Sequence, residues 1–131
     1  MSAIALVLAL LALLLGGFGP RETVRSEADG KVVRWVRAER LPPAAVPGAR
    51  LFATSGCTAC HTYLGTGSRN LGAPDLSAEG RRGRGITWHV RHLTCPSCVV
   101  PGSPMPPFRA LGKGNLRSLA VFLEHSRGRR R

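Results

Sequence analysis

Cys57, Cys60 and His61 form the pattern C-x-x-C-H within the stretch ATSGCTACHTYLG, residues 53–65. This is the attachment pattern for c-type haem. Its spacing lets both thiols add to the two vinyl groups of one porphyrin, while the adjacent imidazole turns to the iron. The motif therefore predicts one covalently attached haem c, with Cys57 and Cys60 as the attachment points and His61 as an axial iron ligand.

The other two cysteines, Cys95 and Cys98, form a second C-x-x-C pair within CPSC. Four thiolates can bind one tetrahedral zinc ion, so a zinc-binding structural module that uses both pairs is an alternative from another class. Zinc ribbons are built on hairpins, however, whereas both pairs here adjoin helical patterns. A second haem is rejected because Val99, and not a histidine, follows Cys98.

A second iron ligand is expected downstream, and Met105 is the best candidate. It is the only internal methionine and lies between prolines in VVPGSPMPPFRAL. A loop so rich in Pro and Gly is not a core helix, but it is a stiff frame that can hold a thioether against an iron. His/Met ligation raises the reduction potential of a haem. His89 and His92 are the rival ligands.

Apolar residues recur at helical spacing in residues 85–93 and 115–127, and residues 47–56 are a short helix start with Pro47 near its first turn and Gly56 as a stop. Gly- and Pro-rich loops separate them, and no strand pattern of any length occurs. We therefore expect an all-α domain over residues 47–127, followed by a basic tail at 128–131. A domain of this size has a small hydrophobic core, and its stability often depends on a disulfide, a metal or a cofactor.

The N-terminus begins with an uncharged apolar run, Ser2 to Phe18. Its helical length of about 25 Å is at the short end of a bilayer span. We interpret residues 1–19 as a transmembrane anchor, with a cleaved signal as the alternative. Both place the rest of the chain on the extracytoplasmic side of the cytoplasmic membrane, where free thiols oxidise. The basic residues after the run argue against this placement, because the positive-inside rule alone would keep them in the cytoplasm.

Residues 20–46 are predicted to form a tether. The segment begins with polar residues and includes prolines at 42 and 43, and such prolines favour an extended spacer. Trp35 is expected to be partly buried in a short strand, and the alternatives are that it packs back on the domain or lies at the lipid interface.

Taken together, residues 48–125 resemble a class I mono-haem cytochrome c. The matching motifs follow in the family's order: a helix leading to C-x-x-C-H, the loop GAPDL, a middle helix ITWHVRHL, the loop SPMPPF and a last helix NLRSLAVFL. The resemblance implies that the carbonyl of Pro74 accepts a hydrogen bond from His61. It also implies that Phe52 and Phe122 pack where the terminal helices cross, and that Trp88 lies near the haem propionates.

The CPSC pair departs from the family pattern. We expect Cys95 and Cys98 to form a structural disulfide that braces the methionine loop, with a redox-active or regulatory thiol pair as the alternative. CHTYLGTGS with an N-terminal anchor also resembles the cytochrome subunits of nitric oxide reductases and the anchored cytochromes that serve terminal oxidases.

The formal net charge of +12 is not accompanied by a nucleic-acid recognition motif. A basic surface also steers encounters with acidic redox partners. The sequence therefore predicts an electron carrier and not an enzyme: a membrane-anchored cytochrome that transfers single electrons in a respiratory chain on the periplasmic side. A fixed subunit of a terminal oxidase or nitric oxide reductase is the alternative within the same class.

Overall fold

The computed structural model describes residues 20–128, and within this part the chain is mostly helical, as expected for the all-α class. In chain order the helices are α2 (Pro20–Glu39), α3 (Val46–Thr54), α4 (Ile86–Thr94), α5 (Pro96–Val99) and α6 (Gly112–His125). Two short strands, β1 (Thr62–Tyr63) and β2 (Thr66–Gly67), form an antiparallel hairpin. The expected anchor at 1–19 and the last three residues of the expected tail lie outside the described residues. None of the helices in the described part is long and apolar enough to cross a bilayer.

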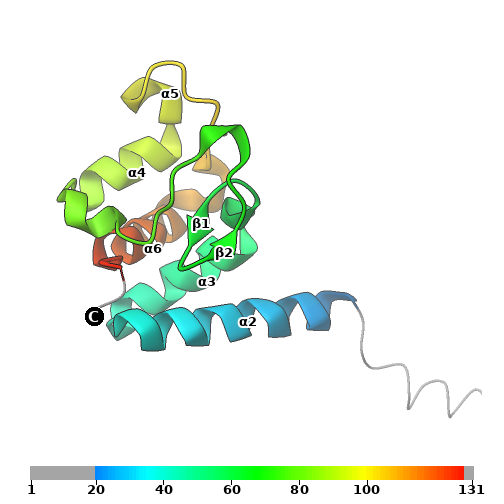
Figure 1. The fold of residues 1–131 in the computed structure, drawn as a ribbon. Coiled ribbons are helices and arrows are strands. Elements are labelled where there is room, and N and C mark those ends of the chain that lie inside the picture. Colours follow the sequence, from blue (N-terminus) through cyan, green and yellow to red (C-terminus); the bar gives the residue numbers. More distant parts are fainter. Residues whose placement is uncertain (1–19, 129–131) are drawn as a thin grey trace, which may run out of the picture.

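Helices α3 and α6 cross at the centre of the molecule (Figure 1). Gly48 makes this close approach possible, because a Cβ atom there would lie 2.0 Å from the carbonyl oxygen of Ser118 and 2.6 Å from Cβ of Phe122. The rings of Phe52 and Phe122 meet at the crossing, with their centroids 5.5 Å apart. The packing that the family resemblance implied for these two phenylalanines is therefore present.

Helix α2 corrects the expectation of an extended tether over residues 20–46. It lies along α3 (Figure 1) and buries one face, formed by Ala28, Val32, Trp35 and Glu39 at helical spacing. The prolines that suggested an extended spacer occur only after this helix, where a short 3-10 turn at Pro43–Ala45 follows. The folded part of the chain therefore begins within α2 and not at residue 47.

Trp35 is the centre of an aromatic cluster, and its predicted place in a partly buried strand is wrong. Only 1% of its surface is exposed, and its ring lies against those of Phe52, Tyr63 and Phe122 at centroid distances of 5.9, 5.0 and 6.3 Å. Aromatic packing of this kind adds stability beyond the burial of apolar area. Helix α2 is thus part of the core.

The end of the chain is tied back to this core. The backbone N–H of Arg127 donates to Glu39 Oε2 at 2.8 Å, and Tyr63 Oη lies 3.0 Å from Ser126 Oγ. Burial raises the pKa of Glu39 above its usual value, although the bond from Arg127 acts in the opposite direction. These contacts join α2, the hairpin and the C-terminus on the side of α3 and α6 away from α5.

Helix α4 packs on α6, and the chain then makes an excursion through α5 and the methionine loop before it enters α6 (Figure 1). The excursion is closed at its base by the backbone N–H of Phe108, which donates to the carbonyl of Leu93 at 2.8 Å. Within the excursion α5 packs chiefly against α4. The loop itself contacts the core through Met105 and Phe108.

Candidate functional site

One cavity of about 280 Å³ brings together six of the eight residues that the sequence marked as functional: Cys57, Cys60, His61, Pro74, Trp88 and Met105. They come from the turn after α3, the loop after the hairpin, helix α4 and the loop before α6. Cys57 and Met105, which are almost fifty positions apart in the chain, thus line the same cavity.

The C-x-x-C-H motif folds as a tight turn directly after α3. Gly56 has a φ of +83°, a conformation that glycine adopts without strain, and it redirects the chain into Cys57. The backbone N–H groups of Cys60 and His61 both donate to the carbonyl of Cys57, at 3.2 and 2.9 Å. This turn carries Cys57, Cys60 and His61 together to the cavity wall.

The sulfur atoms of Cys57 and Cys60 are free, and Cys57 is buried. Burial raises the pKa of Cys57 to about 11, and the neighbouring Cys60 adds to the rise. Cys57 is therefore a neutral thiol near pH 7.

His61 is oriented by Pro74. Its Nδ1 atom lies 2.9 Å from the carbonyl oxygen of Pro74, the partner that the family resemblance implied. Because a carbonyl can only accept, Nδ1 carries the proton and Nε2 keeps its lone pair for a metal. Hydrogen bonds to a ligating histidine of this kind fix the tautomer and the ring orientation.

The residues after Pro74 are fastened to the hairpin. Leu76 N–H donates to the carbonyl of Thr62 at 2.9 Å, and the Thr62 hydroxyl donates to the carboxylate of Asp75. Asp75 also accepts from the backbone N–H of Ser77 at 2.9 Å. Burial acts to raise the pKa of Asp75, but the bonds from Thr62 and Ser77 outweigh it and the pKa lies below its usual value. Sequence reasoning missed Asp75, although Asp-x-Ser directly after Pro74 is typical of such a turn.

Met105 faces the cavity from a loop without regular structure. Its side chain is half-buried and packs against the core, and its backbone N–H donates to Ser103 Oγ at 3.3 Å. The structure thus places the predicted thioether ligand and the C-x-x-C-H motif on the same cavity.

The two rival ligands, His89 and His92, also line the cavity but differ in their partners. His89 is buried, and its Nε2 lies 3.3 Å from Glu124 Oε2 on α6, within ion-pairing distance although not aligned as a hydrogen bond. His92 stacks on Trp88 with ring centroids 4.9 Å apart, and its buried Nδ1 has no hydrogen-bond partner among the described residues. Burial, with a smaller effect of the Arg84 charge, lowers the pKa of His92 below its usual value. His89 therefore has a carboxylate beside its ring, and His92 does not.

A charged cluster lies at the edge of the cavity beside Trp88. Glu79 is buried, and its two carboxylate oxygens lie 3.1 Å from Nε of Arg82 and 3.5 Å from Nε of Arg84. The guanidinium of Arg84 also lies over the Trp88 ring, 4.0 Å from its centroid. These contacts fix two positive side chains at the cavity edge, and one of them, Arg84, covers the ring of Trp88 on α4.

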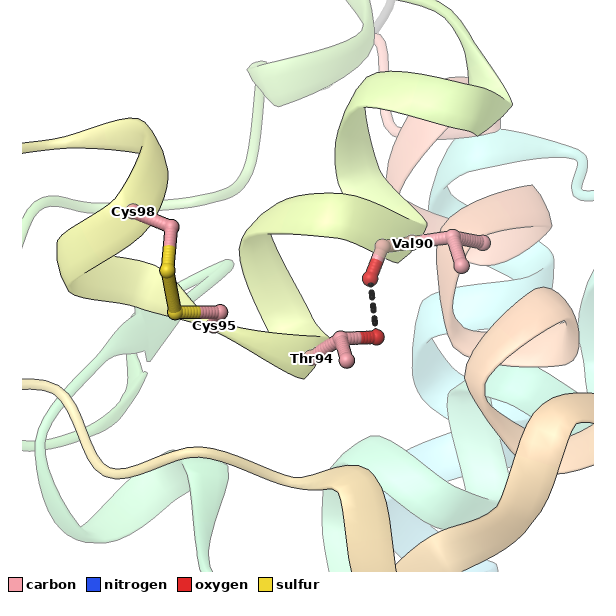
Figure 2. The surroundings of a disulfide bond; sticks show 4 residues. All are labelled: Val90, Thr94, Cys95 and Cys98. Carbon is pink, nitrogen blue, oxygen red and sulfur yellow. Dashed lines mark hydrogen bonds between the residues drawn. A yellow bond between two sulfur atoms is a disulfide. The ribbon is translucent and has the colours of Figure 1, made fainter.

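Cys95 and Cys98 are joined as a disulfide, which spans the junction of α4 and α5 (Figure 2). Their Cα atoms are 5.3 Å apart, within the usual range for such a bond. Because these two sulfurs are bonded to each other, they are not thiolates that could complete a four-cysteine zinc site. The part of the chain that the structure describes also contains no group of three or more His, Cys, Asp or Glu side chains placed to hold a metal ion.

Known proteins offer no independent identification. No protein-family model matches the chain, and no curated protein or solved structure matches it either. The functional argument therefore depends on the geometry of the cavity and on the motifs that line it.

Proposed function

We propose that the protein is a membrane-anchored, mono-haem c-type cytochrome that carries single electrons in a respiratory chain on the periplasmic side of the cytoplasmic membrane. One observation carries the proposal: His61, its Nδ1 bonded to the Pro74 carbonyl, faces the same cavity as Cys57, Cys60 and Met105. Each feature taken singly also occurs in proteins that bind no haem. Their convergence from separate parts of the chain favours one prosthetic group shared by all four.

The residues present fit a haem. Two free thiols with the attachment spacing lie beside a histidine whose Nε2 is available, and a thioether faces the same cavity. Cys57 and Cys60 would hold the porphyrin through thioether bonds, and His61 and Met105 would be the axial ligands. When bound, such a group supplies one-electron exchange at its iron.

The remaining cavity residues favour a carrier over a catalyst. Leu76, Pro104 and Phe108 line the wall with apolar surface, which excludes water from the prosthetic group. His61 and Met105 would both hold the iron of this group, which would leave no coordination position for a substrate.

Partners of this carrier would be other redox proteins with acidic docking surfaces. The net charge of +12 is largely exposed arginine, for example Arg91, Arg109 and Arg117. A surface of this sign attracts acidic proteins over long range, and the attraction weakens as salt is added.

Haem attachment is the direct test. The chain is produced in a host that exports it and attaches haem c, and the membranes are analysed by haem staining after denaturing electrophoresis. Stain is expected on the wild type, weaker stain on Cys57→Ala, and none on the double variant C57A/C60A. The matched control is C95S/C98S, which alters the other C-x-x-C pair and should keep the stain. Stain that persists in C57A/C60A, or is absent from the wild type, would refute the proposal.

A further inference from the structure

The loop that presents Met105 is connected to the disulfide by a series of local hydrogen bonds. Cys98 N–H donates to the carbonyl of Cys95 at 3.1 Å, and Val100 N–H donates to that of Pro96 at 2.8 Å. Ser103 N–H then donates to the carbonyl of Val100 at 3.0 Å, and Ser103 Oγ accepts from Met105 N–H at 3.3 Å. Each of these turns overlaps the one before it in the chain or shares a residue with it.

The first of these turns needs the disulfide. Helix α5 has four residues, and an isolated helix that short is not stable in water. Figure 2 shows the disulfide closing α5 onto the end of α4, while the hydroxyl of Thr94 donates to the carbonyl of Val90 at 2.7 Å within α4 itself. Opening the disulfide would therefore leave the bonds within α4 in place and remove the covalent link that holds α5, and the loop after it, to the end of α4.

Cys98 is the reachable sulfur of the pair. Its residue is exposed, whereas Cys95 is half-buried. Thiol–disulfide exchange requires a thiolate to reach one sulfur of the bond. A dithiol in solution can thus attack at Cys98 without unfolding the protein.

His92 is the side chain placed to take the position of Met105 in the cavity. It belongs to α4, which stays folded, and it lines the same cavity as Met105. Its buried Nδ1 has no hydrogen-bond partner among the described residues, and no carboxylate lies beside its ring as Glu124 lies beside that of His89. A buried polar atom without a partner is unfavourable, and bonding of this Nδ1 atom to a metal would give it one.

We propose that His92 is a reserve axial ligand, which replaces Met105 on the haem iron when the Cys95–Cys98 disulfide is reduced. This inference rests on the proposed function, because it presupposes the covalent haem. The disulfide then controls the reduction potential, since exchange of a thioether for an imidazole lowers it. The carrier has a high-potential form with the disulfide closed and a low-potential form with it open.

The switching step is a two-electron thiol–disulfide exchange. A dithiol attacks one sulfur, a mixed disulfide forms, and its second thiol completes the exchange. The Cys95–Cys98 bond breaks and takes up two electrons and two protons, while the attacking dithiol loses them and becomes a disulfide. The ligand exchange that follows moves no further electrons.

The test compares purified ferric holoproteins by their sulfur-to-iron charge-transfer band and by magnetic circular dichroism, which distinguishes His/Met from His/His ligation. C95S/C98S represents the open form. Wild type that is reduced with dithiothreitol, alkylated and reoxidised at the iron provides a second open form. Both are expected to lack the band under the conditions in which untreated wild type shows it, and to be low-spin with a His/His signature. Their reduction potentials should fall at the same time.

Removal of His92 identifies the replacing ligand. C95S/C98S with His92→Phe keeps a ring against Trp88, and it should be high-spin when ferric and bind carbon monoxide when ferrous. The matched control adds His125→Ala, which removes an exposed histidine of α6 and should stay low-spin.

Three results would overturn the inference: an open form that shows the band as wild type does, a low-spin open form that does not need His92, or a high-spin open form in which His92 is present. If the proposed function itself is wrong, a different result is expected: the wild-type protein will have no covalent haem or no charge-transfer band.

Discussion

Nδ1 of His61 lies 2.9 Å from the carbonyl oxygen of Pro74, thirteen positions further along the chain. The two residues meet because Asp75 bonds to Thr62 and Ser77, which holds the segment after Pro74 against the hairpin after His61. A histidine fixed in this tautomer is a stronger metal ligand, since the carbonyl increases the basicity of the ring.

The first prediction tests this support. Asp75→Ala removes the acceptor for Thr62 and Ser77 and should loosen the bond between Pro74 and His61. A less basic ring favours ferrous iron, so the reduction potential should rise by tens of millivolts, where about 59 mV is a tenfold change for a one-electron couple. Asp75→Asn is the milder control, because its single amide oxygen can still accept one of the two bonds. Redox titration is the measurement, and equal potentials for both variants and wild type would contradict the role given to Asp75.

The second prediction concerns Met105. Met105→Ala should lower the reduction potential by more than about 60 mV, which is a tenfold change for this couple, whether water or an imidazole replaces the thioether. Adding His92→Phe should leave one coordination position open, so that the ferrous form binds carbon monoxide. Redox titration and absorption spectra with carbon monoxide are the measurements. An unchanged potential and spectrum in Met105→Ala would show that another residue is the second ligand.

The third prediction tests whether α2 belongs to the folded domain. Trp35→Ala removes the ring at the centre of the aromatic cluster and should lower the free energy of unfolding by about 3–5 kcal/mol. Val33→Ala is the control on the same helix, because Val33 is 49% exposed and its truncation should cost less than about 0.5 kcal/mol. Urea unfolding of the ferric holoprotein is the measurement. Similar small losses in both variants would mean that α2 does not contribute to the core.

The fourth prediction concerns Glu39 and pH. Burial raises its pKa in the folded protein, so the folded state binds the proton more tightly than the unfolded state. The stability due to this group is therefore complete below its usual pKa and is lost as pH rises through the folded value. Glu39→Gln can still accept from Arg127 and has no charge to bury.

We therefore expect the free energy of unfolding of wild type, relative to that of Glu39→Gln, to decrease between pH 4 and pH 7. Urea titrations across this range provide the comparison. Glu27→Gln is the control because Glu27 is exposed, and its curve should follow that of wild type more closely. Parallel curves for wild type and Glu39→Gln would argue against a raised pKa.

The sequence was most informative where the determinants are local. The C-x-x-C-H turn is built from contacts within five residues, and the three predicted helices follow from apolar spacing and from the Gly and Pro residues between them. The one large error, the tether, also has a local cause. The helical spacing of Ala28, Val32 and Trp35 was present, but polar residues surround it and the prolines beyond it favoured an extended spacer.

Only the tertiary structure could distinguish His89 from His92. The two lie three positions apart on one helix, so their spacing puts them on the same face. From the sequence, either histidine could therefore be a ligand. Glu124, on a different helix, lies beside the ring of His89, whereas among the described residues no hydrogen-bond partner meets Nδ1 of His92. Local spacing determines which side chains share a face, whereas the partner that each one meets there depends on how distant segments pack.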